Sequence, residues 1–256
     1  MAIRRAAHQI LDRPLILDDP FAIRIIGPEQ AARLPQDSKS DDAAARGMRA
    51  FMAVRSRFAE DELCKAVTIG IKQYVVLGAG LDTFAYRNPH PGLRVFEVDH
   101  PATQQWKREL LQSAGIAIPS EAVFVPVDFE RKTLSAGLVS NGFRADHSAF
   151  FSWLGVVPYL SERAFEDTLS FVAALPKPSS VVFDYAVARS ALSWKERIML
   201  DALAARVAAA GEPLSCSSNP NSSRRNCERW ALPTSKTWDR MKSTAATSLG
   251  VPMVFS

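Results

Sequence analysis

The part of this sequence best suited to bind a small ligand is a glycine turn that follows a short apolar segment. Residues 75–77 (Val-Val-Leu) predict a buried strand, and Gly78-Ala79-Gly80 comes directly after it. Because glycine lacks a side chain, the backbone can turn tightly there and approach a ligand closely. Asp82 is placed as the N-cap of a helix that opens over residues 83–86. A strand, a glycine turn and a helix in this order commonly bring backbone N–H groups against a nucleotide-like ligand.

Two aspartates follow at the ends of the next two predicted strands. Asp99 ends the segment 94–98 and lies after Gly80 at a spacing typical of nucleotide-binding α/β units, where an acid roughly 20 residues on hydrogen-bonds the ribose. Asp128 follows the segment 122–126, although a single acid at a strand end is often only a helix cap. Together with the turn, the two acids could hold the ribose and the adenine amine of an adenosyl ligand.

The glycine pattern alone has two other interpretations. A Gly-x-Gly turn also joins strands to helices where no ligand binds. The full dinucleotide fingerprint needs a third glycine, and that position is Thr83 here. The sequence therefore disfavours an NAD-dependent oxidoreductase without excluding it.

The elements that position these residues follow from the pattern of apolar residues, and residues 1–70 are expected to be helical. One helix follows Asp18-Asp19-Pro20 and stops at Gly27-Pro28. A polar connection is expected over 35–42. A longer helix is expected from about Ala43 to Lys65, with an apolar stripe along one face.

From Tyr74 onward, strands and helices are expected to alternate. The expected strands are 73–77, 94–98, 122–126, 148–153 and 180–184. The expected helices begin near Asp82, Pro101, Arg131 and Ser161, and another covers 190–210. This alternation predicts an α/β fold with a mostly parallel, doubly wound sheet, whose ligands bind at the carboxyl ends of the strands.

Length and cysteine content narrow the class of protein. At 256 residues the chain suits one large α/β domain with a small cap. No apolar run approaches the ~18 residues needed to span a bilayer, and the basic N-terminus lacks a signal-peptide core, so we expect a cytoplasmic protein with no membrane partner. The spacing of Cys64, Cys216 and Cys227 suits neither a metal site nor a disulfide framework, and we expect no bound metal.

The net charge of +4 comes from the C-terminal segment. Residues 214–256 hold six basic and two acidic residues, so residues 1–213 are balanced. The high isoelectric point therefore does not indicate that the folded body binds nucleic acid.

Four ordered segments carry a resemblance to a known family. They are LGAGLDT at 77–83, FEVDHP at 96–101, VPVDF at 125–129 and FFSWLGV at 150–156. They resemble the strand-end motifs of S-adenosylmethionine-dependent methyltransferases similar to leucine carboxyl methyltransferase, in particular a bacterial, largely actinobacterial branch. The segments 18–22 and 55–61 resemble two further stretches of that branch, and the resemblance covers about residues 5–213.

The resemblance implies a Rossmann-like class I methyltransferase fold that uses S-adenosylmethionine. Residues 1–70 would form an N-terminal helical cap, residues 71–213 the cofactor-binding core, and residues 214–256 an atypical tail. The cofactor-binding residues that it implies are Arg57, Gly78, Ala79, Gly80, Asp99, His100, Asp128 and Phe129.

Each implied residue has a role by the same resemblance. The glycine turn would face the methionine part of the cofactor. Asp99, beside His100, would take the ribose hydroxyls, and Asp128 with Phe129 would hold the adenine. Arg57 would pair with the cofactor carboxylate, for which Arg55 is the competitor; a bidentate guanidinium–carboxylate pair suits that role.

Two positions depart from the patterns of related enzymes. Val76 stands where many methyltransferases carry an acid before the first glycine, which is normal for this family. Leu154 stands where carboxyl methyltransferases carry an acid in the fourth motif, so the acceptor specificity is not transferred with the resemblance.

The implied reaction is methyl transfer to an unidentified acceptor, which is a small molecule or a carboxyl or hydroxyl group. A carboxylate needs no general base, whereas a hydroxyl or an amine needs one. His100, His147, Asp184 and Tyr185 are conceivable bases, but each has a simpler role as a cap or a packing group, so no catalytic residue is assigned. The alternative is a non-catalytic or degraded protein that binds an adenosyl ligand. The oligomeric state is left open.

The tail over 214–256 is rich in serine and threonine and has no sustained apolar period. The resemblance implies a helix and a terminal β-hairpin there, so the final strands are expected to be missing or altered. We hypothesise a one-nucleotide frameshift near Pro213, because codons can be chosen so that the neighbouring frame encodes an amphipathic helix. A natural disordered basic tail is the alternative. Without its last strands the sheet would expose an edge, and the protein would be poorly stable and weakly active.

Overall fold

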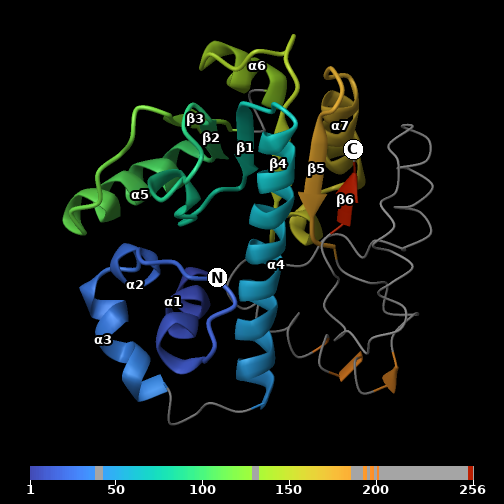
Figure 1. Ribbon diagram of the computed structural model, residues 1–256. Coiled ribbons are helices and arrows are strands. Elements are labelled where there is room, and N and C mark those ends of the chain that lie inside the picture. Colours follow the sequence, from blue (N-terminus) through green and yellow to red (C-terminus); the bar gives the residue numbers. More distant parts are fainter. Residues whose placement is uncertain are drawn as a thin grey trace. The chain divides into compact units, whose positions relative to one another are not determined.

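The computed structural model describes residues 1–37, 43–128, 133–185, 193–194, 197–198, 201 and 253–255 (Figure 1). The chain divides into two compact units, residues 1–144 and residues 145–256. The first unit holds the N-terminal helices and the glycine turn, and the second holds the aromatic segment 150–153 and the strand after it. The functional boundaries expected at residues 70 and 213 stay predictions.

The chain begins with the helices α1 Ala2–Leu11, α2 Ala22–Ile25, α3 Pro28–Asp37 and α4 Ala43–Thr68 (Figure 1). α1 contacts α2, α3 and α4 and so links this group. The helical character of this region and the long helix from Ala43 are confirmed. The polar connection expected over 35–42 is wrong for its first residues, because α3 begins at Pro28, a favoured first helical residue, and continues to Asp37.

An ion pair joins the end of α1 to α4. The buried Arg49 donates to both carboxylate oxygens of Asp12, with Nε–Oδ2 at 3.1 Å and Nη2–Oδ1 at 2.9 Å. The Nδ1 atom of the buried His8 lies 2.8 Å from Asp12 Oδ2, while its Nε2 atom faces the N–H groups of Ile16 and Leu17 at 3.2 and 3.4 Å. Nε2 must therefore accept hydrogen bonds, which assigns the ring proton to Nδ1. These bonds hold α1 and the loop after it against α4.

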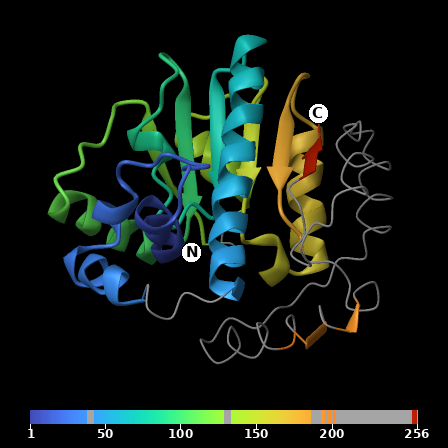
Figure 2. The same ribbon diagram turned by 60° about the horizontal axis from the view of Figure 1, so that its bottom comes forward.

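The strands of the first unit are β1 Gln73–Leu77, β2 Arg94–Asp99 and β3 Ala122–Pro126, and β2 pairs in parallel with both others (Figure 2). All of β1 and most of β2 are buried, as expected for parallel strands covered on both faces. Leu77 pairs with Val98, and Asp99 pairs with Pro126, so the carboxyl ends of these strands lie along one edge. The predicted strand positions in this unit are confirmed.

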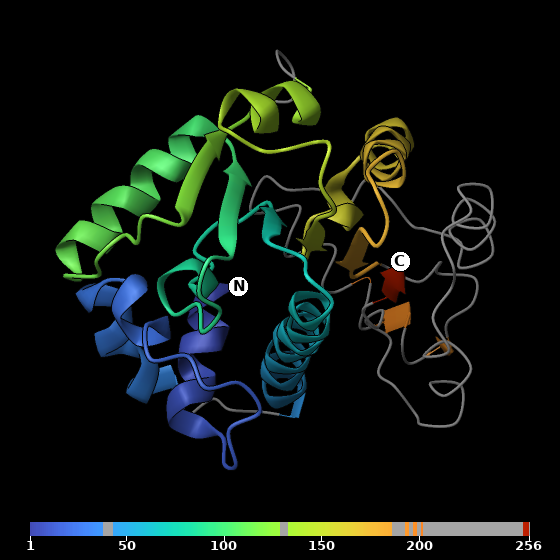
Figure 3. The same cartoon turned by 45° about the horizontal axis from the view of Figure 1, so that its top comes forward.

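The helices α5 Pro101–Ser113 and α6 Leu134–Ser140 both contact β3, and Figure 3 shows α5 alongside it. α5 begins near the predicted residue, with Pro101 in its first turn. α6 packs so closely that a Cβ atom added to Gly137 would lie 2.4 Å from Val127 Cγ2. Glycine at this position therefore sets the distance between α6 and the end of β3.

The helix predicted to open after Asp82 is confirmed only as one 3-10 turn, η2 Phe84–Tyr86. The predicted capping by Asp82 is present, because its Oδ1 atom accepts from the Phe84 N–H at 2.8 Å. Pro89 lies three residues after η2 ends. A proline lacks the N–H that a continuing helix needs and disfavours helical backbone at the residue before it. Asn88 instead accepts a hydrogen bond from the His90 N–H at 2.9 Å, which turns the chain towards β2.

The second unit contains β4 Phe150–Trp153, η3 Val157–Tyr159, α7 Glu162–Ala173 and β5 Ser180–Phe183. β4 and β5 pair in parallel, as predicted. α7 begins where the sequence predicts, because Ser161 Oγ accepts from the Ala164 N–H at 3.2 Å. Phe165 of α7 stacks on Trp153 at 5.6 Å between ring centroids and meets Phe183 edge-on at 5.4 Å, which holds the helix against both strands.

The expected helix over 190–210 and most of the tail over 214–256 lie outside the described residues. Within the tail, β6 Met253–Phe255 pairs antiparallel with β5, so these residues do add a strand to the sheet. The frameshift hypothesis stays a prediction that the codons of the gene would test. None of the helices in the described residues has the length and apolar character needed to cross a bilayer.

Replacing Asp12 by asparagine should destabilise the protein at neutral pH and flatten its acid dependence. The hydrogen bond from Arg49 holds the pKa of Asp12 below its ordinary value, so the carboxylate stabilises the fold at pH above about 4 and loses that contribution as the pH falls through its folded pKa. We expect Asp12→Asn to cost about 2 kcal/mol at pH 7 and much less near pH 3. Urea unfolding at several pH values measures this difference.

Asp61→Asn is the matched control, because Asp61 forms an exposed ion pair with Arg57 on α4. Such pairs contribute about 0.5 kcal/mol or less. Equal losses in the two variants, or a loss in Asp12→Asn that is independent of pH, would contradict this account.

Candidate cofactor site at the glycine turn

The glycine turn has the left-handed backbone that its composition predicts. Gly78 has φ 65° and Gly80 has φ 46°, values that side chains rarely allow. The Ala79 N–H donates to the Val98 carbonyl at 3.1 Å, which fixes the turn to β2. A Cβ atom added to Gly80 would meet nothing nearer than Gly78 O at 4.0 Å, so the space beside the turn is open to a ligand.

Asp99 holds this turn from the end of β2. Its Oδ2 atom accepts from the Gly80 N–H at 2.6 Å, and its Oδ1 atom accepts from the His100 N–H at 2.7 Å. A carboxylate offers about four lone-pair directions, so two of them stay available to hydroxyl donors. The sequence spacing correctly predicts that Asp99 and the glycine turn lie together.

The remaining predicted residues lie at or near the same strand ends. Asp128 is partly exposed two residues after β3, and the preceding Val127 N–H donates to the Asp99 carbonyl at 3.0 Å. His100 is exposed, and its Nδ1 atom accepts from the Ala102 N–H at 3.2 Å, so its ring caps α5. Phe129 lies outside the described residues. The strand ends therefore place a glycine turn and two acids along one edge.

The two candidate arginines lie in different surroundings on α4. Arg57 has 55% of its side chain exposed and pairs with Asp61 at 2.8 Å. Arg55 is buried, and its guanidinium lies 5.5 Å above the centre of the Phe51 ring. The two candidates thus differ in burial, although their positions in the motif do not distinguish them.

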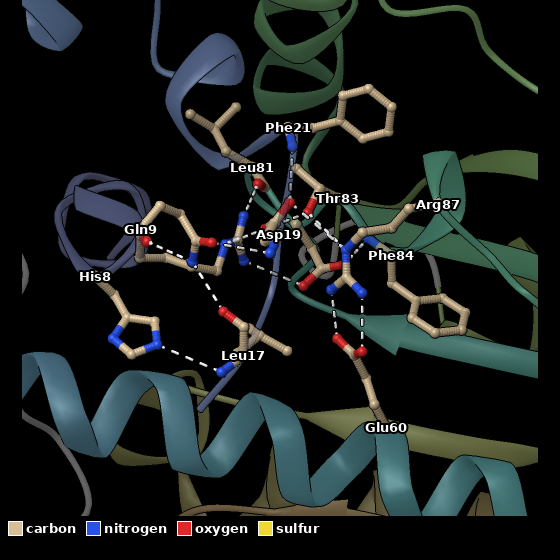
Figure 4. A network of polar contacts seen from close by, with 12 residues as sticks. His8, Gln9, Leu17, Asp19, Phe21, Glu60, Leu81, Thr83, Phe84 and Arg87 are labelled. Carbon is tan, nitrogen blue, oxygen red and sulfur yellow. Dashed lines mark hydrogen bonds and ion pairs between the residues drawn. The ribbon is translucent and has the colours of Figure 1, made fainter. Parts of the chain in front are cut away.

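A buried polar network beside the turn was not predicted from the sequence (Figure 4). Its centre is Asp19, whose side chain is 0% exposed. Asp19 Oδ2 lies 2.9 Å from Arg5 Nε and accepts from the Thr83 hydroxyl at 2.6 Å. Asp19 Oδ1 accepts from the Phe21 N–H at 3.1 Å, so the local capping role expected of this segment is also present. The local pattern gives no signal for the contact with Thr83.

The network continues from the turn to α4. Arg87 forms two hydrogen bonds with the carboxylate of Glu60, and its Nε atom lies 3.6 Å from Asp19 Oδ1. Burial works against the charge of Arg87, but the Glu60 carboxylate raises the pKa of Arg87, so it remains a cation. Loss of solvent also opposes ionisation of Asp82, but the charges of Arg5, Lys107 and Arg87 hold the pKa of Asp82 below its usual value.

A second buried cluster joins β2 to α5. Glu97 Oε2 accepts from Lys107 Nζ at 2.8 Å and from the Tyr86 hydroxyl at 2.9 Å. Burial raises the pKa of Glu97, while the Lys107 ammonium opposes that change. Burial and the Glu97 carboxylate raise the pKa of Tyr86, so its hydroxyl keeps its proton. This cluster joins the 3-10 turn after the glycine turn to the helix after Asp99.

The conceivable bases of the second unit have structural partners. Asp184 is buried, and its Oδ1 atom accepts from the Gly155 N–H at 2.6 Å. Burial raises the pKa of Tyr185 to about 12. His147 is exposed and lies 3.0 Å from Asp146. Among the residues that the structure describes, no group of acids, histidines and cysteines could hold a metal ion.

Comparison with known proteins identifies relatives across most of the chain. The family model for leucine carboxyl methyltransferase matches residues 1–173. A Bacillus subtilis protein provisionally named S-adenosyl-L-methionine-dependent methyltransferase YktD is 35% identical over 240 residues, which cover 83% of this chain and 78% of the relative. A Saccharopolyspora erythraea protein of the same provisional class is 36% identical over 199 residues, or 75% of this chain and 68% of the relative.

Solved structures show the same fold at low identity. A DUF574 family protein from Streptomyces avermitilis has a TM-score of 0.56 and 14% identity, covering 100% of this chain and 96% of its own. A Thermobifida fusca protein, provisionally titled a methyltransferase, has a TM-score of 0.56 and 15% identity, covering 96% and 98%. The fold is thus that of Rossmann-like class I methyltransferases. The chain belongs to the leucine carboxyl methyltransferase family, and it is an S-adenosylmethionine-dependent methyltransferase.

Proposed function

We propose that this enzyme binds S-adenosylmethionine along the edge formed by the glycine turn, Asp99 and Asp128, and methylates a small molecule through a carboxyl or hydroxyl group. The observation that carries the proposal is the 2.6 Å hydrogen bond from the Gly80 N–H to Asp99, which sets an acid beside an open glycine turn. The family match supports S-adenosylmethionine against NAD. The proposal includes the cytoplasmic location and the lack of a nucleic-acid partner expected from the sequence.

The residues present suit an adenosyl ligand. The unused lone pairs of Asp99 could accept both ribose hydroxyls without releasing the Gly80 amide. Asp128, at the end of the neighbouring strand, could accept from the adenine amine. The left-handed glycines leave room for the methionine part, since a Cβ atom at Gly80 would fill open space.

For the cofactor carboxylate we favour Arg55 over Arg57. The Arg57 side chain is exposed, and an exposed ion pair with a ligand would be weak. The buried Arg55 has a guanidinium held against Phe51, and a partly desolvated guanidinium binds a carboxylate more strongly. We therefore prefer Arg55, which the sequence motif offers as the alternative to Arg57.

S-adenosylmethionine supplies an activated methyl group on a sulfonium. The protein must then align the acceptor with the S–CH₃ bond and exclude water. A carboxylate acceptor needs no general base, which fits the surroundings of the candidate bases. Burial raises the pKa of Tyr185 to about 12, so its hydroxyl keeps its proton, and Asp184 accepts from a backbone amide. His100 caps α5, and His147 lies 3.0 Å from Asp146. We therefore favour a carboxylate acceptor, although Leu154 gives no reason to expect leucine itself.

Removing either acid should weaken cofactor binding. We expect Asp99→Ala and Asp128→Ala each to cost about 1.5–3 kcal/mol, or about 10- to 150-fold in Kd for S-adenosylhomocysteine, measured by calorimetry. Asp146→Ala is the control, because Asp146 is an exposed acid on another loop. The wild type should not bind NAD. Unchanged affinity in both Asp99→Ala and Asp128→Ala would rule out the proposed site.

The choice between the arginines can be tested with two ligands. If Arg55 pairs with the cofactor carboxylate, Arg55→Gln should weaken S-adenosylhomocysteine about 10-fold or more. The same variant should bind 5′-methylthioadenosine, which lacks the carboxylate, within about 2-fold of the wild type. Arg57→Gln should change neither. Equal losses for both ligands would mean that Arg55 only supports the fold.

The reaction itself can be tested in cell extract. The purified protein should transfer a radiolabelled methyl group from S-adenosylmethionine into a low-molecular-weight fraction. If the acceptor is a carboxylate, the label should be released as methanol by mild base, because methyl esters hydrolyse under these conditions whereas ethers and methylamines do not. A protein that binds the cofactor but transfers no label would instead favour a non-catalytic binding role.

A further inference from the structure

We infer that Asp19, in the N-terminal cap, is a positioning residue for cofactor binding and that it acts through Thr83 on the segment that continues the glycine turn. This inference rests on the proposed function, because the turn matters to catalysis only if the cofactor binds there. The residues involved come from distant parts of the sequence, since Asp19 and Thr83 are 64 positions apart.

Asp19 is surrounded by groups that require its negative charge. The Nε atom of Arg5 lies 2.9 Å from Asp19 Oδ2, and the Nε atom of Arg87 lies 3.6 Å from Asp19 Oδ1. The two arginine side chains are only 11% and 13% exposed. The Thr83 hydroxyl, 2.6 Å away, is the contact that leads to the turn (Figure 4). Because Thr83 is itself fully buried, its hydroxyl cannot exchange this partner for water without moving the backbone.

Arg5 also binds the two residues before Thr83, which are Leu81 and Asp82. It donates through Nη2 to the Leu81 carbonyl, and its Nη1 atom lies 3.4 Å from Asp82 Oδ2. Residues 81–83 are therefore held in succession by side chains of the N-terminal segment, one through its backbone and two through their side chains (Figure 4).

The two halves of the segment 78–83 are thus held from different sides. Gly80 and Ala79 are bound by Asp99 and by the Val98 carbonyl of β2, and this half is open to a ligand. The half over 81–83 is bound by the cap and is closed to solvent at Thr83. A ligand at the open half meets a fixed backbone only while both sets of contacts persist. If the second set is lost, the turn samples other conformations, and the apparent Kd rises by the reciprocal of the fraction of molecules that stay competent to bind.

The chain offers a matched control for mere loss of stability. The bond between Asp12 and Arg49 also fixes the N-terminal segment, but it joins α1 to α4, whereas residues 81–83 are bound by Arg5 and Asp19. Breaking it should lower the melting temperature without changing the turn. If Asp19 and Thr83 position the turn, breaking their contact lowers the affinity for the cofactor, whereas breaking the Asp12–Arg49 bond lowers only the stability.

The test uses the full chain and three variants. Thr83→Val removes only the hydroxyl and keeps the shape, Thr83→Ser keeps the hydroxyl, and Asp12→Asn is the control. Kd for S-adenosylhomocysteine is measured by calorimetry at a temperature where all are folded. We expect Thr83→Val to bind about 10-fold more weakly, while Thr83→Ser and Asp12→Asn stay within about 2-fold of the wild type. Amide hydrogen exchange should accelerate over 80–84 in Thr83→Val and not over β2.

Other outcomes overturn the inference or the proposed function separately. A folded Thr83→Val protein with wild-type affinity, or an equal loss in Asp12→Asn, overturns the inference and leaves the proposed cofactor site intact. If Thr83→Val does not fold, Asp19→Asn takes its place and must show the same loss of affinity. A folded wild type that binds neither S-adenosylmethionine nor S-adenosylhomocysteine overturns the proposed function, and the inference with it.

Discussion

The hydrogen bond from the Gly80 amide to the Asp99 carboxylate is the interaction on which the proposed site depends. Parallel pairing brings the ends of β1 and β2 to one edge, but pairing alone does not set the conformation of the turn between them. Asp99 sets it, since its two oxygens accept from Gly80 at 2.6 Å and from His100 at 2.7 Å. The same carboxylate keeps two lone-pair directions for further hydrogen-bond donors. One residue therefore shapes the site and offers it an acceptor.

Buried ion pairs lie around this turn. We expect them to favour one arrangement of the neighbouring segments more than they stabilise the fold. Glu97 pairs with Lys107 at 2.8 Å, and Asp19 pairs with Arg5 at 2.9 Å. Such pairs add little over apolar residues of the same size, because each charge must first lose its water. They are nevertheless strongly selective, since a buried charge without its partner is very costly. The pairs thus favour one set of contacts around the turn. Apolar residues in their place would discriminate less between alternative contacts.

The sequence predicts those features of the fold and the site that depend on local pattern. The strands are short apolar runs, and Asp99 is found by its spacing from the turn. The contact between Asp19 and Thr83 could not be predicted, because it depends on how two segments 64 positions apart pack together. Both residues also have adequate local roles. The burial of Arg55 did have a signal, since the buried Met52, Ala59 and Leu63 share its helical face.

Thr83 shows why a missing glycine can be informative. In dinucleotide-binding proteins, the third glycine of the fingerprint lets a helix pack closely against the strand. Here the chain forms only a 3-10 turn, so that close approach is not needed. The position is instead used for a side chain, whose hydroxyl donates to Asp19 at 2.6 Å. A glycine at 83 would release this contact and leave a buried carboxylate short of one donor. The residue that disfavours NAD binding thus has a structural role, because its hydroxyl ties this turn to the N-terminal segment.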